Sequence, residues 1–157
     1  MSPLILLRPS NGASAAHGAE RALLRHASKQ GYLALSIDAS ASSDPLATLE
    51  GQLAAVASVE RGEVATKLAA WEWARHLDDL HVITNRPILI VISEFDAIAE
   101  LHEADAICAN IRSAIQQRRR WFYVVMSGIA AGPLDRWLKD FDHPIYELGP
   151  VEYLQED

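Results

Sequence analysis

Residues 88–98 read ILIVISEFDAI, and the pattern in this stretch indicates the fold class. Five aliphatic residues in a row precede Ser93, Glu94 and Asp96. A strand that is apolar at both odd and even positions has no polar face, which is typical of a central strand in a parallel sheet covered by helices on both sides. The run FYVVM at 122–126 has the same character. The two runs predict an α/β domain with a buried parallel sheet.

The rest of the chain alternates strand and helix patterns around these two runs. Gly31 is a suitable C-cap for the first helix, and Asp44 followed by Pro45 is a suitable start for the second. The alternation predicts one domain over 1–157, a three-layer sandwich with a five-stranded, mainly parallel sheet. We expect strands at 3–7, 32–37, 87–92, 121–126 and, more weakly, 144–148, and helices at 15–30, 45–58, 60–81, 104–119 and 133–141.

The composition restricts the class of protein. The chain is 50% hydrophobic and carries a net charge of −7, which argues against non-specific nucleic-acid binding. Cys108 is the only cysteine, so an internal disulfide is impossible, and the six histidines lack metal-site spacing. We find no signal-peptide pattern and no apolar run near the ~20 residues of a membrane helix. We therefore expect a cytoplasmic protein without metal or membrane contacts.

Ligands of such sheets bind where the strands end at their carboxyl edge. At the third strand, ILIVISEFDAI resembles the Walker B segment of P-loop ATPases, and the wider stretch with Phe95 and Asp96 resembles AAA-type and STAND-type (archaeal-type) members in particular. At the fourth strand, VVMSG resembles their sensor-1 segment, with Ser127 at the position that reads the γ-phosphate. The resemblance implies a P-loop NTPase-like sheet order of 5-1-4-3-2.

The resemblance also identifies eroded motifs. The family's phosphate loop is GxxxxGK[ST], in which backbone N–H groups, a lysine and a hydroxyl hold the phosphates and magnesium. In the overlay, Arg8 takes the first glycine position, Ser14 the lysine position and Ala15 the Ser/Thr position. Ser93 replaces the magnesium-binding aspartate of Walker B, while Glu94 keeps the catalytic glutamate position. The degenerate loop consists of Pro9, Ser10, Asn11, Gly12, Ala13, Ser14 and Ala15.

Several interpretations of this edge remain open. The loop could be a plain strand-to-helix turn, a degenerate phosphate loop, or an active loop with unusual chemistry. Each missing charge-assisted contact is worth about 1.5–3 kcal/mol, so we expect no cofactor. ATP and magnesium enter only if Glu94 and Ser127 form an atypical ATPase site, completed by a partner chain. Glu94 and Asp96 are otherwise structural carboxylates.

Two segments are candidates for protein contacts. In LAAWEWARHLDDL, Trp71 and Trp73 point about 200° apart on a helix, so one packs in the core and the other faces a partner, or both pack internally. The basic cluster Arg118, Arg119 and Arg120 follows a helix C-terminus, where positive charge offsets the helix dipole. The cluster could also reach a partner's site. A third possibility is a small nucleic-acid-binding surface, against which the negative net charge of the chain argues.

The closing segment LGPVEYLQED resembles the approach to the helical lid of these ATPases, and we expect no lid in this chain. Three functions are consistent with these observations. The first is a non-catalytic scaffold or regulatory domain that binds a protein partner, either itself or an active relative. The second is an atypical ATPase that uses Glu94 and Ser127. The third is a small α/β binding protein unrelated to the family.

Overall fold

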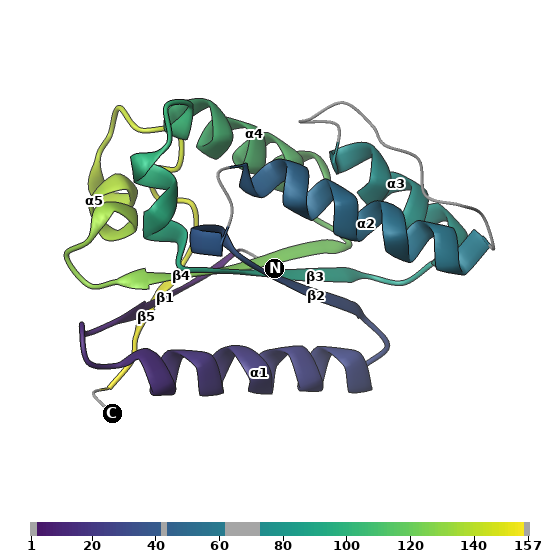
Figure 1. Ribbon diagram of the computed structural model, residues 1–157, viewed down its shortest axis with the longest axis horizontal. Coiled ribbons are helices and arrows are strands. Elements are labelled where there is room, and N and C mark those ends of the chain that lie inside the picture. The colour runs from purple at the N-terminus through teal and green to yellow at the C-terminus, as the bar shows by residue number, and fades with distance from the viewer. Residues whose placement is uncertain (1–2, 42–43, 62–72, 156–157) are drawn as a thin grey trace.

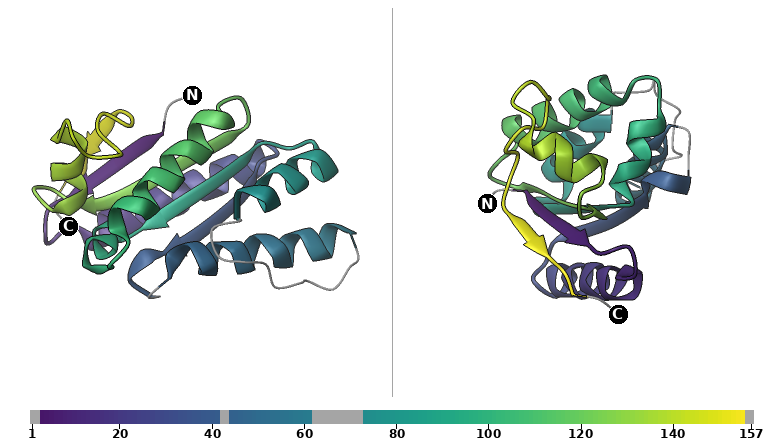
Figure 2. Two further views of the ribbon diagram at one scale, coloured as in Figure 1. Left: turned by 90° about the horizontal axis from the view of Figure 1, so that it is seen from above. Right: turned by 90° about the vertical axis from the view of Figure 1, so that its left-hand side faces the viewer.

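The computed structural model describes residues 3–41, 44–61 and 73–155. A twisted sheet separates two layers of helices (Figure 1). One helix, α1, covers one face, and α2, α3, α4 and α5 cover the other. The view along the sheet shows the same division, with α1 alone on its side (Figure 2). No helix within these described residues combines the length and apolar character that a membrane crossing requires.

The sheet has five strands in the order β2-β3-β4-β1-β5, and every neighbouring pair is parallel. The predicted sheet order and fold class are therefore confirmed, and the sheet is parallel throughout. The central strands are buried on both faces, as their unbroken apolar runs predicted. The strands are β1 Leu4–Arg8, β2 Leu33–Asp38, β3 Ile88–Ser93, β4 Phe122–Ile129 and β5 Val151–Tyr153.

Within the described residues, five α-helices and two 3-10 turns connect the strands. Gly31 adopts φ 89° just after α1, as its expected role at the helix end requires. The carboxylate of Asp44 accepts a hydrogen bond from the Ala47 N–H at 3.1 Å, which confirms the predicted cap of α2. The helices are α1 Ala13–Lys29, α2 Pro45–Arg61, α3 Trp73–Thr84, α4 Ala104–Gln117 and α5 Pro133–Lys139, and the 3-10 turns are Ala39–Ala41 and Phe95–Glu100.

The larger part of the core lies between the sheet and the four-helix layer, where Phe95, Phe122 and Leu77 are fully buried. The smaller part lies under α1 and contains Leu6, Leu89, Val91 and Val125. This asymmetry follows from the number of helices on each face, because a single helix cannot cover five strands.

The predicted fifth strand at 144–148 is wrong, and the strand lies at Val151–Tyr153. The apolar side chain of Ile145 is fully buried, but turns hold its backbone, and Glu147 has φ 49°. The guanidinium of Arg112 donates to the carbonyls of Pro144 and Tyr146, each at 2.9 Å. The apolar pattern at 144–148 thus reflects burial of a turn.

The predicted helix at 60–81 corresponds in part to α3, which begins at Trp73 and extends to Thr84. Residues 62–72 lie outside the described residues. The helices predicted at 104–119 and 133–141 are present and end two residues earlier than expected.

Candidate functional site

The candidate site lies at the carboxyl edge of the sheet, next to the first turns of α1. Asp38 pairs in register with Ser93, and Ile92 pairs with Met126, so Ser93 and Ser127 lie side by side on neighbouring strands. On the face toward α1, β3 presents Leu89, Val91 and Ser93, and β4 presents Val125 followed by Ser127. Each of these two strands therefore places a hydroxyl beneath α1.

Glu20 of α1 joins these two serines. Its carboxylate accepts a hydrogen bond from the Ser127 hydroxyl at 2.6 Å and another from the Ser93 hydroxyl at 2.7 Å. Glu20 is 6% exposed and Ser127 is 4% exposed. A buried carboxylate is tolerated when hydrogen bonds replace its lost hydration, and the two short bonds do so here. We call Glu20, Ser93 and Ser127 the Glu20 cluster.

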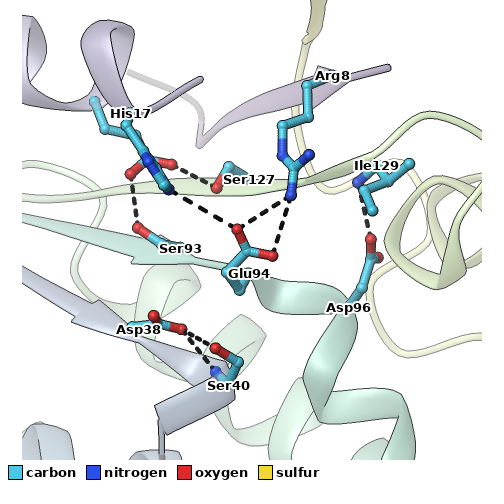
Figure 3. A network of polar contacts seen from close by, with 10 residues as sticks. Arg8, His17, Asp38, Ser40, Ser93, Glu94, Asp96, Ser127 and Ile129 are labelled. Atoms are coloured by element: carbon cyan, nitrogen blue, oxygen red, sulfur yellow. Dashed lines mark hydrogen bonds and ion pairs between the residues drawn. The ribbon is translucent and has the colours of Figure 1, made fainter. Parts of the chain in front are cut away.

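Arg8 and Glu94 form a second polar pair at the same edge. One guanidinium nitrogen of Arg8 lies 3.2 Å and 3.3 Å from the two carboxylate oxygens of Glu94. His17 of α1 approaches the same carboxylate, with Nε2 3.9 Å from Oε1. Figure 3 shows Arg8 and His17 converging on Glu94 from two different elements. The Arg8 side chain is largely buried, so its guanidinium is held against Glu94 and has little access to solvent.

Glu94 is held in an unusual backbone conformation. It has φ 53° and ψ 44°, in the left-handed region that non-glycine residues seldom occupy. The residue sits between the end of β3 and the 3-10 turn at Phe95–Glu100. Conformations of this kind persist only where surrounding contacts hold them. The bond to Arg8 is such a contact.

The loop between β1 and α1 is a closed turn of four residues, 9–12. The Gly12 N–H donates to the Pro9 carbonyl at 2.9 Å. A Cβ at Gly12 would lie 2.8 Å from Cδ of Pro9 and 3.2 Å from the Gln155 carbonyl, so the turn packs against itself and against the chain's last described residues. The N–H of Gly12 therefore points into the turn.

Two further carboxylates at this edge have structural partners. Asp96 accepts the N–H groups of Ile129 and Leu134, both at 2.8 Å, and so fastens the end of β4 to the start of α5. Asp38 accepts the N–H and the hydroxyl of Ser40 at 2.8 Å and 2.6 Å. Figure 3 shows the contacts of Asp96 with Ile129 and of Asp38 with Ser40. Asp96 is thus a cap for a different helix, not a partner for Glu94.

The structure changes the boundaries of the predicted loop. Ala13, Ser14 and Ala15 belong to α1, so only Pro9, Ser10, Asn11 and Gly12 form the loop. Arg8 is the last residue of β1, and Ser127 lies inside β4. The reason is that the flanking backbone continues its strand or helix hydrogen bonds further than residue type alone suggests.

A cavity of about 440 Å³ adjoins the loop. The side chains around it carry no positive charge. They belong to Leu7, Pro9, Ala130, Tyr153, Leu154 and Gln155. Within residues 3–41, 44–61 and 73–155, no cluster of three or more His, Cys, Asp or Glu residues could bind a metal ion.

The predicted interface residues have different environments. Trp73 is 1% exposed, packs against Phe122, and donates its Nε1–H to Asn110 at 2.6 Å, so its expected role at a partner surface is wrong. A tryptophan at this helix position satisfies both its ring and its N–H inside the domain. Trp71 lies outside the described residues.

The arginine cluster lies at the amino ends of the strands, away from the Glu20 cluster. Arg118 donates to both carboxylate oxygens of Asp78, at 2.7 Å and 2.9 Å, so its charge is neutralised within the chain. This ion pair and the position of Arg118 at the end of α4 are consistent with the structural interpretation of the cluster. Arg119 and Arg120 are exposed.

Sequence reasoning missed Glu20, which is the centre of the site. The signal was present, because Glu20 interrupts the buried stripe of α1 formed with Ala16 and Ala27. A carboxylate at helical spacing within an apolar stripe needs a buried partner. Ser93 and Ser127 were chosen for other reasons, and only the folded chain brings all three together.

Comparison with known proteins identifies the fold. No protein-family model matches the chain, and no curated protein matches it in sequence. Among solved structures, a Walker-type ATPase of Pyrococcus abyssi aligns with 98% of this chain at TM-score 0.66 and 15% identity. The ORC2 protein of Aeropyrum pernix, solved with ADPNP and ADP, aligns with 99% at TM-score 0.65 and 13% identity. The ORC1 protein of A. pernix, solved with DNA, aligns with 99% at TM-score 0.60 and 15% identity.

These alignments cover 48%, 42% and 39% of the three solved chains, so this chain spans less than half of each. At such identities the likeness concerns the fold alone. The chain has a P-loop NTPase-like α/β fold, with the same general architecture as archaeal Walker-type ATPase and ORC proteins.

Proposed function

We propose that this chain is a P-loop ATPase-like domain that has lost nucleotide chemistry and acts as a protein-binding or regulatory scaffold. The observation that carries the proposal is the Glu20 cluster. Ser93 and Ser127 occupy the positions that the family resemblance assigns to magnesium binding and to γ-phosphate reading. Both hydroxyls donate to the buried Glu20 carboxylate.

The residues present do not fit a magnesium-bound triphosphate. The overlay leaves no lysine at Ser14 and no carboxylate at Ser93. Arg8 is bonded to Glu94, so their opposite charges offset each other, and Glu20 adds a negative charge beside them. A triphosphate would meet net negative charge in a partly buried setting, where like charges repel more strongly than in water.

The turn at 9–12 supports the same proposal. A phosphate loop holds its ligand with several inward-facing N–H groups. Here the Gly12 N–H is bonded to Pro9 within the turn, and the nearest cavity has no cationic side chain. The eroded motifs inferred from the sequence and this closed turn are independent arguments against a nucleotide cofactor.

With nucleotide chemistry gone, the sheet and its helices provide a rigid surface for another protein. A second copy of this chain and an active relative are both suitable partners in this proposal. Glu94 carries the alternative function, because it keeps the catalytic glutamate position and is 31% exposed at the site. As an atypical ATPase, the chain would need its missing cations from a partner, since Arg8 is already paired with Glu94.

Titration calorimetry with ATP, ADP and GTP, with and without magnesium, tests the proposal. We expect no binding heat up to about millimolar nucleotide, because several charge-assisted contacts of about 1.5–3 kcal/mol each are absent. The matched controls are Glu94→Gln and Ser14→Glu. Micromolar binding by the wild-type chain that either variant abolishes would overturn the proposal and establish the atypical nucleotide site.

A further inference from the structure

The outward face of α1 carries an unusual stripe of positive charge. Arg21, Arg25 and Lys29 are spaced four residues apart, so they share one face of the helix, and all three are exposed. The only carboxylate in α1 is the buried Glu20. The whole chain has 21 Asp and Glu against 14 Lys and Arg. We call Arg21, Arg25 and Lys29 the basic stripe.

Within the described residues, the basic stripe has no counter-charge. Across residues 3–41, 44–61 and 73–155, none of its three side chains forms a hydrogen bond or an ion pair. Lys29 lies in the last turn of α1, where a cation offsets the helix dipole. That explanation does not reach Arg21, which lies two turns earlier. In the described part of this acidic chain, the cationic face of α1 therefore has no carboxylate partner.

A groove runs beside the basic stripe. It has a volume of about 380 Å³ and lies between α1 and the edge strand β2. Strand β2 turns Leu33, Leu35 and Ile37 toward the four-helix layer, and its small residues toward α1. The groove is lined by Leu24, Arg25, Ser28, Lys29, Ala34 and Ser36.

The outer edge of β2 lacks the usual protection of edge strands. Its sequence LALSID contains no lysine, arginine or proline, and it is six residues long. The opposite edge strand, β5, has only three residues, and a short edge offers little for another chain to pair with. Within the described residues, β2 pairs only with β3. Figure 1 shows β2 beside α1, with no other helix on that face.

We propose that this groove binds an extended acidic segment of a partner protein, which adds to the free edge of β2 and places its carboxylates on Arg25 and Lys29. Residues four apart on a helix rise by about 6 Å. Side chains on one face of a strand repeat every ~6.6 Å. An extended segment with Asp or Glu at alternate positions therefore matches the basic stripe. This inference rests on the proposed scaffold function and names the chemistry of its partner.

A nucleic acid fits this surface less well than a protein segment. Phosphates would gain from the three cations, but the net charge of −7 repels a long, densely charged nucleic acid more strongly than a short segment with a few carboxylates. The groove also has small and apolar walls at Leu24 and Ala34, which suit side chains and a pairing backbone.

Fluorescence anisotropy with a labelled peptide of alternating Glu and Val tests the inference. The peptide is about eight residues long, enough to span β2. We expect saturable binding that weakens as salt rises. The Arg25→Glu/Lys29→Glu variant should weaken binding by at least about tenfold, because two attractive contacts become repulsive. A second variant, Ser36→Glu, places a like charge in the groove and should also weaken it.

The matched control is Arg119→Glu/Arg120→Glu, which makes the same charge change at the amino ends of the strands and should leave binding unchanged. Equal binding of a Gln–Val peptide, or unchanged binding by the Arg25→Glu/Lys29→Glu variant, would overturn the inference. Binding of duplex DNA or phosphatidylserine vesicles in place of the peptide would also overturn it. So would a dimer of this chain, detected by light scattering, that the Arg25→Glu/Lys29→Glu variant no longer forms.

Nucleotide calorimetry on the same samples separates this inference from the proposed function. Peptide binding together with micromolar nucleotide binding would overturn the proposed loss of nucleotide chemistry and keep the docking groove. Absence of both would overturn the groove and leave the scaffold proposal to another surface.

Discussion

Replacing Glu20 with alanine removes the acceptor that joins α1 to the two central strands. In the native protein this carboxylate accepts the hydroxyls of Ser127 at 2.6 Å and Ser93 at 2.7 Å. The variant keeps the helix, since alanine has the highest helix propensity. The perturbation therefore acts on the Glu20 cluster and leaves the local backbone preference intact.

The expected cost follows from the exposure of the two hydroxyls. Ser127 is 4% exposed, so its hydroxyl loses a charged acceptor without gaining water, at about 2–3 kcal/mol. Ser93 is less buried and can turn to solvent, which limits its loss to about 1 kcal/mol. Relief from burying a carboxylate offsets about 1–2 kcal/mol. We expect the free energy of unfolding to fall by about 2 kcal/mol, and Tm to fall by about 4–8 °C.

Urea unfolding followed by tryptophan fluorescence measures this change. The control is Glu100→Ala, an exposed glutamate in the 3-10 turn, which should stay within about 0.5 kcal/mol of wild type. A double-mutant cycle with Ser127→Ala isolates the bond, because Ser127 has no donor to lose once it is alanine. The coupling energy between Glu20 and Ser127 should be about 1–2 kcal/mol.

Two results would refute this reasoning. The first is a Glu20→Ala variant as stable as the Glu100→Ala control. The second is additivity of Glu20→Ala and Ser127→Ala within about 0.3 kcal/mol. Either would mean that the Glu20 carboxylate does not hold α1 to the sheet, and the main support for the proposed function would fail.

Two further predictions concern titratable groups. Burial, with a smaller effect from Asp105, raises the pKa of Cys108 to about 12. A thiol reagent at about pH 8 should therefore label Cys108 far more slowly in the native chain than in urea. Equal labelling rates would contradict the burial of Cys108. Burial acts to raise the pKa of Asp135, but the Ala131 N–H and the Lys139 ammonium outweigh burial and hold this pKa below 3.8. The ionised Asp135 carboxylate therefore stabilises the fold above about pH 5, and this stabilisation is lost as the pH falls through the folded-state pKa. Asp135→Asn should flatten the fall in unfolding free energy between about pH 5 and pH 2, and a curve parallel to wild type would exclude this role.

The predicted fold followed from local pattern. The runs at 88–92 and 122–126 are hydrophobic at consecutive positions and so on both faces of the sheet, and this requirement is the same wherever a strand lies between two helix layers. The sheet order came from the family resemblance, and the structure confirmed it. The fifth strand was misplaced because an apolar residue such as Ile145 gives the same sequence pattern whether it is buried in a turn or in a strand.

The sequence predicted the strand-end residues of the candidate site but not the partners that they contact. Ser93, Glu94 and Ser127 were identified because each follows or ends an apolar strand, and ligands of parallel sheets meet that edge. Arg8 was treated as a substitute for a glycine, and its bond to Glu94, 86 residues away, was not foreseen. The two apolar faces of its helix make Trp73 a candidate for a protein contact without showing which tryptophan is buried, whereas the structure places Trp73 in the core against Phe122 and Asn110.

Local sequence pattern was enough to predict the fold class, the sheet's buried strands and the edge where polar residues gather, because these depend on periodicity and on the order of elements along the chain. Which polar groups meet depends instead on how the chain folds. Glu20 reaches Ser93 across 73 residues and Ser127 across 107, and no spacing rule spans such separations. The direction of each side chain is set by how α1 lies on the sheet, and this packing turns isolated polar residues into a closed cluster.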